Sequence, residues 1–534
     1  MPLLITDIKL PATADERELQ RRIAKRCGVD ARALRSVRVV RRALDARKKE
    51  DIHFLLHALV ETDAATQGRL LSGGDARIRP YAPQQAPEPI PGGNALRGRI
   101  VVAGLGPAGL FCAHELARYG YAPLVVERGE PVEKRVQSVS RFWSAGELNR
   151  ECNVMFGEGG AGTFSDGKLT SRSKDARQGY VLEILARFGA PEEIRVDAKP
   201  HIGTDRLRTV VSGLRREIVR LGGEVAFSTR LDGIWMNNGE IGGVVLTDAQ
   251  GTRRTACGAL VLAIGQGARD TCRMLFEAGV AMQKKPFAVG VRIEHPQSLI
   301  DGAQFGALAG NPRLGAASYA LTGKSGARGV YTFCMCPGGS VIAAASDGGQ
   351  VVVNGMSDYA RDAENANAAV VVQVHGGDLG AHPLDGMRFQ EEMERAAFAA
   401  GGGGFIAPAM RVGDFLSKRK PAGFGAVAPS YRPGVLAYDL WQCLPDFVAQ
   451  GVSDGISAFA RRLRGFDMDD AVLTAAETRT SAPLRILRDE SLQSTSHRGV
   501  YPVGEGAGYA GGIISAAIDG LRAAQAVICR FARP

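Results

Sequence analysis

Three glycines are spaced to approach a phosphate group in the stretch RIVVAGLGPAGL, about a hundred residues into the chain. Gly104, Gly106 and Gly109 form the pattern GxGxxG between a strand-like and a helix-like segment. The first glycine makes a tight turn, the second lets the backbone approach a pyrophosphate, and the third lets the helix pack closely. Pro107 and Ala108 would begin that helix, whose positive dipole end faces the phosphates. The spacing predicts a dinucleotide-binding turn.

The residues that follow this turn favour a particular kind of dinucleotide. Glu127 ends the next strand about 20 residues on, where an acid binds ribose hydroxyls and disfavours the 2′-phosphate of NADP. Arg128 and Arg135 are basic residues able to approach the cofactor. Val225 lies in a short strand expected to line an adenine edge, and Gly265 ends a buried strand that returns the chain to the cofactor.

A second glycine-dense turn lies near the C-terminus, in YPVGEGAGYAGGIISAAIDGLRAA. A strand leads into Gly504 and Glu505, and Gly511, Gly512 and Ile513 begin a long helix. The N-terminus of that helix could face a flavin pyrophosphate or the N1–C2=O edge of a reduced flavin. A plain NAD domain needs no second turn of this kind, so the sequence predicts FAD.

Several polar residues could take part in chemistry beside a flavin. Gly160 and Gly162, in FGEGGAGTFSDGKL, offer amide donors, and a cation such as Lys168 could stabilise an anionic reduced flavin. His201 and His295 could each act as a general acid. The alternatives are a solvated lysine on a surface loop and histidines that are structural.

Two cysteines and an arginine complete the set of catalytic candidates. Cys334 and Cys336 would share one face of a strand, which permits a redox dithiol, although both could equally be small buried side chains. Arg479 could bind a substrate anion or a flavin oxygen, with a structural salt bridge as an equal alternative. No cluster has the spacing of metal ligands, so we expect no metal site.

The pattern of elements that must position these residues indicates an α/β fold. We expect a discontinuous Rossmann-like FAD-binding domain, an inserted mixed β-sheet substrate domain and a small N-terminal α+β module. The expected boundaries are a module at 1–62, a Pro/Gly-rich linker at 63–96, the FAD-binding domain at 97–286 and 476–534, and the insert at 287–475. We also expect Asp15 and Gly28 to cap a helix in the module.

Composition and charge restrict the class of protein. The 534 residues are 45% hydrophobic and 23% charged, values typical of a globular protein rather than a disordered or fibrous one. Of the net charge of +10, much lies in the first 60 residues, which hold 14 Lys and Arg against 8 Asp and Glu. Nine unpatterned cysteines, no membrane-spanning segment and no signal peptide lead us to expect a cytoplasmic protein.

Long blocks of the sequence resemble a family of FAD-dependent dehydrogenases from bacteria and plastids. These blocks are GLGPAGLFCAHELARYGY, NVMFGEGGAGTFSDGKL, KPHIGTDRLR, KPFAVGVRIEHPQ, GVYTFCMCPGG, ETRTSAPLRILRD and GEGAGYAGGI. The family belongs to the flavoprotein branch with a single Rossmann domain, which also holds the aromatic hydroxylases and geranylgeranyl reductases. The resemblance implies that Glu505, where many flavoproteins carry Asp, contacts flavin or ribityl hydroxyls.

These observations predict an FAD-dependent oxidoreductase that passes hydride or electrons through flavin N5, with FAD held non-covalently. No second GxGxxG unit is present, so NADH or NADPH would bind transiently, or electrons would come from a small-molecule substrate or a redox carrier. An alternative is a flavin-dependent RNA-modifying enzyme that uses the basic module. A further alternative is a non-catalytic, redox-sensing flavoprotein. The sequence indicates no oligomeric state.

Overall fold

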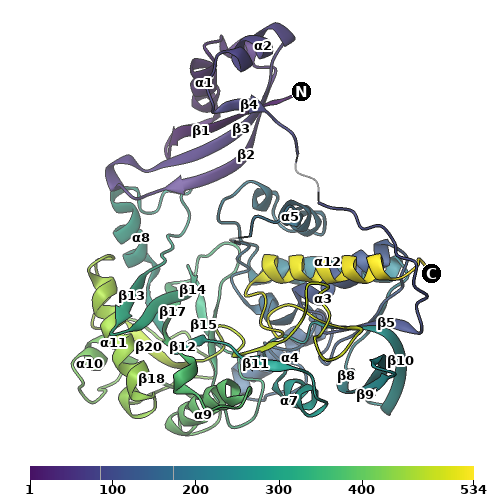
Figure 1. Ribbon diagram of the computed structural model, residues 1–534. Coiled ribbons are helices and arrows are strands. Elements are labelled where there is room, and N and C mark those ends of the chain that lie inside the picture. The colour runs from purple at the N-terminus through teal and green to yellow at the C-terminus, as the bar shows by residue number, and fades with distance from the viewer. Residues whose placement is uncertain (84–85, 172) are drawn as a thin grey trace.

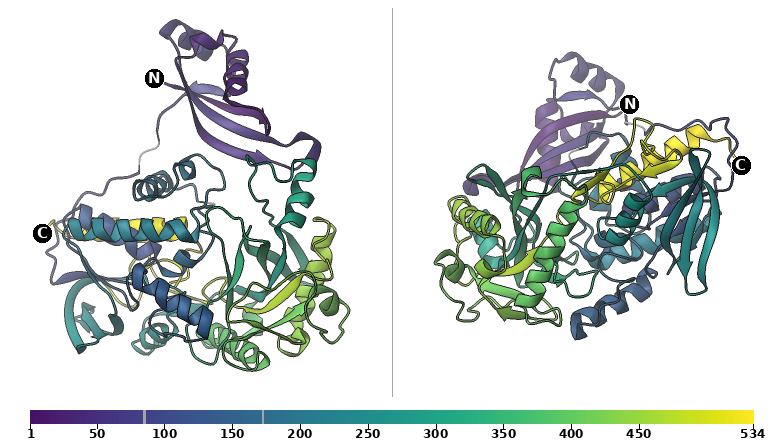
Figure 2. Two further views of the ribbon diagram at one scale, coloured as in Figure 1. Left: turned by 180° about the vertical axis from the view of Figure 1, so that it is seen from behind. Right: turned by 60° about the horizontal axis from the view of Figure 1, so that its bottom comes forward.

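The structure is a computed structural model that describes residues 1–83, 86–171 and 173–534. A small N-terminal module lies above a larger body and contacts it through Arg42 and Asp197 (Figure 1). Within the body, the two parts of the nucleotide domain lie on one side and the inserted domain on the other (Figure 2). In the described residues, no helix combines the length and the apolar character needed to cross a membrane.

The N-terminal module is an antiparallel sheet in the order β2-β3-β1-β4 with two helices packed on it. Asp15 caps the first helix by accepting from the Glu18 amide, and Gly28 ends it in the left-handed conformation, which confirms the expected caps. Its elements are β1 (Leu3–Pro11), α1 (Glu16–Cys27), β2 (Ser36–Asp45), β3 (His53–Glu61), α2 (Ala64–Ser72) and β4 (Ile78–Pro80).

The boundary expected between module and linker was placed too early. Residues 63–80, which we expected in the linker, hold α2 and β4, and β4 pairs with β1. Asp63 caps α2 by accepting from the Thr66 amide, a signal that the Gly and Pro content nearby obscured. The extended segment that follows packs along the end of the last helix, where the Gly92 amide donates to the Ile528 carbonyl.

The nucleotide domain is a sheet in the order β7-β6-β5-β10-β9-β8, with β22 added beside β10. β5, β6, β7, β10 and β22 run parallel, as βαβ units require, while β8 and β9 form an antiparallel extension. The short strand expected around Val225 is β7, and a second strand, β8, follows it closely. The strands are β5 (Arg99–Ala103), β6 (Leu124–Val126), β7 (Glu224–Ala226), β8 (Arg230–Asn237), β9 (Glu240–Asp248), β10 (Gly251–Leu262) and β22 (Val500–Pro502).

Helices cover this sheet, and two of them touch closely. Gly520 in the last helix faces the backbone of Ala108 so closely that a Cβ there would collide with the Ala108 carbonyl. This contact joins the two ends of the nucleotide domain, which are far apart in sequence. The helices are α3 (Pro107–Arg118), α4 (Val132–Ala145), α5 (Arg177–Arg187), α6 (Thr204–Arg220), α7 (Arg269–Glu277) and α12 (Ile513–Arg530).

The inserted domain is a second sheet, in the order β13-β14-β17-β12-β20-β18-β19, with a hairpin of β15 and β16 beside it. Its strands are β12 (Phe287–Pro296), β13 (Thr322–Ser325), β14 (Arg328–Cys336), β15 (Ser340–Ala343), β16 (Val353–Met356), β17 (Asn365–Val374), β18 (Ala407–Arg411), β19 (Val435–Ala437) and β20 (Val472–Glu477). Its helices are α8 (Gln297–Phe305), α9 (Asp385–Ala400), α10 (Val412–Leu416) and α11 (Asp446–Ala460).

The insert ends slightly later than expected. Because β20 pairs with β12 and β18, residues 476–477 belong to the inserted sheet, two residues beyond the expected boundary at 475. Two short strands, β11 (Met282–Lys284) and β21 (Leu484–Ile486), pair with each other where the chain enters and leaves the insert. This pairing fixes the insert to the nucleotide domain at one point.

Candidate functional site

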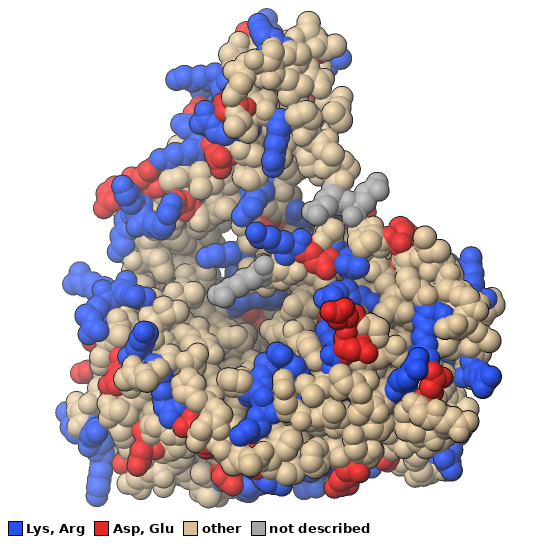
Figure 3. Space-filling view, in the orientation of Figure 1, with Lys and Arg blue, Asp and Glu red and all other residues tan. Residues whose placement is uncertain are grey.

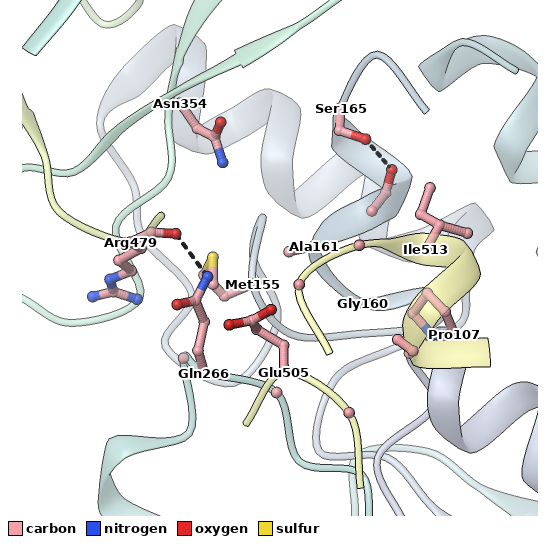
Figure 4. Close-up of a pocket in the computed structure, with 18 of the residues that line it drawn as sticks. Pro107, Met155, Gly160, Ala161, Ser165, Gln266, Asn354, Arg479, Glu505 and Ile513 are labelled. Carbon is pink, nitrogen blue, oxygen red and sulfur yellow. Dashed lines mark hydrogen bonds between the residues drawn. The ribbon is translucent and has the colours of Figure 1, made fainter. Parts of the chain in front are cut away.

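A cavity of about 750 Å³ lies between the nucleotide domain and the insert. Figure 4 shows side chains from both domains converging on it, with Gly160, Ile513 and Pro107 on one side and Asn354 and Arg479 on the other. A cavity of this size is within the range of cofactor and substrate sites, which occur preferentially at domain interfaces.

The glycine turn leaves room for a ligand on this wall. Gly104 has φ +100°, and a Cβ there would collide with the Ala263 carbonyl. Gly106 faces Gly160 across the wall, where a Cβ on Gly160 would lie 3.0 Å from the Gly106 Cα. Gly109 does not line the cavity; a Cβ there would collide with the Gly104 carbonyl, so its role is the close packing of helix on strand.

Two helix N-termini open into the same cavity. Gly106 caps α3 and Gly512 caps α12, and neither uses a side chain to satisfy the first amides of its helix. Free helix amides and the positive dipole end attract a phosphate or another electron-rich group. The residues at these two ends that line the cavity are Gly106, Pro107, Ala108, Gly511, Gly512 and Ile513.

Glu127 lies at the end of β6 and holds the turn in shape. Its carboxylate accepts from three backbone amides, those of Leu105 (2.8 Å), Gly129 (2.9 Å) and Gly157 (2.9 Å). It also lines the cavity, so the remaining acceptor capacity of the carboxylate can take ribose hydroxyls. Together with the glycine cradle and the two helix ends, this donor set fits FAD.

The two arginines after Glu127 have different positions. Arg128 lines the cavity, pairs with Glu151 and Asp270 at 2.9 Å, and lies 4.0 Å over the Phe156 ring. Arg135 does not line it: the side chain is fully buried, and burial lowers the pKa of its guanidinium to about 10. Arg135 instead donates to the carbonyls of Asn153, Val154, Gly157 and Glu158. The expectation that it approaches the cofactor was wrong; it shapes the glycine-rich loop from behind.

The strand predicted to line an adenine edge was misplaced by a few residues. Val225 lies in the middle of β7, packs into the core and does not line the cavity; Thr229 and Leu231 do. Gly265 lines the cavity as expected. The neighbouring Gln266, which sequence reasoning missed, also lines it and donates to the Arg479 carbonyl at 2.7 Å (Figure 4).

The C-terminal turn brings Gly504 and Glu505 to the cavity. Oε1 of Glu505 accepts from the Ala482 amide at 2.8 Å, and burial raises the pKa of its carboxyl. Behind the turn, Asp519 accepts from the Gly504 amide and pairs with Arg488 at 2.7 Å. This buried pair fixes the turn to the first part of α12.

Lys168 reaches the cavity, while His201 does not. Gly162 also lines the cavity, and Lys168 donates to the Met335 carbonyl and pairs with Asp166 at 3.1 Å. His201 lies behind this loop with its ring stacked on Tyr359, and burial lowers its pKa. The expectation that His201 reaches the flavin was wrong, because its half-buried ring stacks on Tyr359 and is hydrogen-bonded to the Tyr359 carbonyl at 3.1 Å instead.

His295 was also wrongly expected near the flavin. It is fully buried in the insert, does not line the cavity, and pairs with the Phe466 carbonyl at 2.8 Å. Burial lowers its pKa to about 4, so the imidazole is neutral at neutral pH. It is a core histidine.

The two cysteines line the cavity, although the strand does not present them on one face. A bulge lies between Phe333 and Cys336, and Cys334 has φ +43°. Cys334 is therefore exposed and Cys336 is buried, with its thiol donating to the Cys334 carbonyl at 3.3 Å. The expected alternation failed because a bulge inserts an extra residue into the strand.

Arg479 lines the cavity as part of a salt-bridge network. Its guanidinium pairs with Glu394 at 3.2 Å, and Glu394 also pairs with Arg269 at 2.8 Å. Arg269 comes from the nucleotide domain and Glu394 from α9 of the insert, so the network links the two domains. The geometry therefore supports the structural alternative for the Arg479 side chain.

Two cavity residues from the insert were missed from the sequence. Glu477 and Asn354 both line the cavity, and Arg292 donates to each of them. Glu477 lies two residues before Arg479 in the block ETRTSAP, but its type and position alone did not distinguish it from its neighbours. Asn354 is in a short hairpin with no motif.

Two family models match parts of the chain. Residues 286–480 match a family described as "FAD-dependent protein, C-terminal domain-like", and residues 1–61 match a domain of unknown function. A protein of Clostridium beijerinckii, described as uncharacterized, is 46% identical over 538 residues and covers 100% of both chains.

Two solved flavoprotein structures are similar to the chain at low identity. The flavin-dependent brominase Bmp2 is 13% identical with a TM-score of 0.38 and covers 81% of this chain and 78% of that chain. A geranylgeranyl bacteriochlorophyll reductase-like protein from Thermoplasma acidophilum is 11% identical with a TM-score of 0.34 and the same coverage.

The family match spans the whole inserted domain, and the full-length relative shares all three parts of the chain. The chain belongs to the same family as this relative, its inserted domain is the C-terminal domain of FAD-dependent proteins, and FAD is its cofactor.

Proposed function

We propose that the protein is an FAD-dependent oxidoreductase that transfers hydride or electrons through flavin N5 to or from a substrate held by the inserted domain. The observation that carries this proposal is that one cavity is lined both by the nucleotide-binding turns and by side chains of the insert. FAD bound to those turns supplies two-electron redox chemistry at the isoalloxazine ring.

The residues of the chain divide the tasks in this cavity. The α3 and α12 ends and Glu127 hold the dinucleotide, while Lys168 provides a positive charge on the wall between the two domains. A cation in that position would favour a negative charge on the reduced cofactor. Tyr319, Phe333 and Met155 give the cavity an apolar lining that excludes water from the reacting groups.

The N-terminal module supports a covering role in this proposal. Arg42 of β2 pairs with Asp197 at 2.7 Å, and the Ala198 amide donates to the Arg42 carbonyl. The next two residues, Lys199 and Pro200, line the cavity. In Figure 3, Lys and Arg side chains are spread over the module and around the hollow beneath it. We infer that the module braces this wall of the cavity and favours the approach of an anionic substrate or carrier.

Anaerobic titration of the purified protein with NADH and then NADPH, followed by the visible flavin spectrum, tests the proposal. Rapid bleaching by one of them, reversed by an added electron acceptor, would support a nicotinamide-driven reductase. A flavin that neither nicotinamide reduces would favour a dehydrogenase that receives electrons from its own substrate or a carrier protein. A flavin that is never reduced and reoxidised by any physiological donor and acceptor would contradict the proposal.

A further inference from the structure

A buried arginine in the insert organises one end of the cavity. Arg292 is fully buried on β12 and donates to Glu477 Oε2 at 2.9 Å, to Asn367 Oδ1 at 2.6 Å and to Asn354 Oδ1 at 3.3 Å. A Cβ on Gly355 would collide with the guanidinium, so a glycine is required there for the arginine to fit. A buried guanidinium is costly unless its N–H groups have acceptors, and here Arg292 has them on Glu477, Asn367 and Asn354.

Glu477 and Asn354 bind the same guanidinium at this end. Arg292 donates to Glu477 through Nε and to Asn354 through Nη2. One arginine therefore orients both side chains. Both residues line the cavity.

Each of these two side chains keeps one polar atom that the described residues do not use. Oδ1 of Asn354 accepts from Arg292 and from the Gly355 amide, which fixes Nδ2 as the other end of the amide. Within the described part of the chain, no acceptor bonds this Nδ2 and no donor bonds Glu477 Oε1, and neither atom is sealed from the cavity. Figure 4 shows the Asn354 amide nitrogen turned toward the cavity.

A polar side chain in the protein interior normally has all its hydrogen bonds satisfied. Glu477 is only 2% exposed, yet one of its oxygens is left for a ligand. The pair thus offers one acceptor and one donor to a ligand on the insert side of the cavity.

We propose that Glu477 and Asn354 form a substrate subsite that takes an uncharged group able both to donate and to accept a hydrogen bond, such as an amide, a lactam or a hydroxyl group. The inference rests on the proposed function, because it assigns a substrate class to the same cavity. A carboxylate would meet the Glu477 oxygen and be repelled, and a ketone would leave that oxygen without a donor.

Two aromatic probes of one size test the subsite in the FAD-loaded protein. Benzamide has the required donor and acceptor, whereas benzoate has acceptors only. Binding of each is measured by the change it causes in the spectrum of the oxidised flavin. The natural sequence should bind benzamide more tightly than benzoate by about tenfold or more.

Glu477→Gln should invert this preference. The new amide would keep its oxygen on Arg292 and turn its nitrogen to the cavity, so two donors would face the ligand and favour benzoate. Asn354→Asp offers two acceptors instead and should favour benzamidine, which carries only donors and a positive charge. This second variant keeps the inference testable if the first one fails to fold.

Glu294→Gln is the matched control. Glu294 is also buried and lies two residues from Arg292 on β12, but it binds Ser430 and Asn365 and does not line the cavity. This variant should keep the preference of the natural sequence. The inference is overturned if no probe changes the flavin spectrum, or if all variants rank the probes alike. Because the flavin stays oxidised throughout, this failure differs from a failure of the nicotinamide titration.

Discussion

The two walls of the cavity are built from different parts of the chain. The nucleotide wall consists mainly of backbone: glycines without side chains and the uncapped amides of α3 and α12. The insert wall consists of side chains such as Glu477, Asn354 and Arg479, each held by a buried charge partner. A backbone wall can bind one common cofactor, whereas a side-chain wall can change its ligand through single substitutions. This difference fits our proposal that one wall holds the cofactor and the other selects the substrate.

Gly104→Ala should have the largest effect, because it disturbs the backbone wall directly. The new Cβ would collide with the Ala263 carbonyl at a residue whose φ is +100°. We expect loss of bound FAD, measured as the ratio of flavin to protein absorbance. Gly239→Ala is the control, since Gly239 has φ +80° but no atom within 4 Å of its Cβ. An equal loss of FAD from the two variants would show that backbone strain, not the collision, decides FAD binding.

This contrast also explains how far the sequence could predict the site. Gly104, Gly160, Gly504 and Gly512 were found because a backbone turn needs glycine at fixed spacing. The βαβ pattern and the insertion followed from the same local rules, and the cofactor followed from the two turns. Binding by the backbone depends on the local spacing of glycines, so a single sequence can reveal it.

Side chains of the other wall depend on contacts that local sequence does not encode. His201 and His295 have a catalytic residue type, but the first packs on Tyr359 and the second on Phe466, and Arg135 donates to four carbonyls behind a loop. The sequence did not identify Glu477 as a site residue, although it faces the cavity, because only Arg292, far away in sequence, orients it. Long-range packing decides the direction of each of these side chains.

Glu394→Gln should weaken the salt-bridge contact between the nucleotide domain and the insert. Removing the carboxylate leaves Arg269 and Arg479 buried without their partner, and breaking such a network costs about 3–5 kcal/mol of unfolding free energy. Urea unfolding, monitored by the release of flavin, measures the change in the free energy of unfolding. Glu217→Gln, which breaks only the exposed pair with Arg220, should leave the midpoint unchanged. Equal midpoints for both variants would show that the network does not join the domains.

The same salt-bridge network of Glu394, Arg269 and Arg479 predicts a dependence of stability on pH. Burial alone would raise the pKa of Glu394, but Arg479 and Arg269 outweigh it and lower the pKa from 4.5 to about 2. The contribution of this group is therefore complete above about pH 4.5 and is lost as the pH falls toward 2. Acid unfolding of Glu394→Gln should lack this component when it is compared with the natural sequence.

Glu127→Gln should have a smaller effect on the nucleotide wall than Gly104→Ala. The carboxylate accepts hydrogen bonds from three backbone amides, and a glutamine would place an N–H donor opposite one of them. We expect FAD affinity to fall by about 10- to 100-fold, as for one unsatisfied buried donor. Flavin fluorescence during titration of the apoprotein measures it. Glu224→Gln, at an exposed position on the neighbouring strand, should not change the affinity; a similar loss there would point to general damage to the sheet.

The smallest effect is expected at Cys334 and Cys336, where the insert wall could have held a second redox centre. The bulge leaves the Cys334 thiol exposed to the cavity and directs the Cys336 thiol to the Cys334 carbonyl. Because the two side chains do not share a face of the strand, they are poorly placed to exchange electrons with a flavin as a dithiol. Anaerobic reduction with dithionite should consume two electrons per FAD in the natural protein and in Cys334→Ser alike. Four electrons in the natural protein, falling to two in the variant, would show that the insert wall carries a redox-active disulfide and stores electrons beside the cofactor.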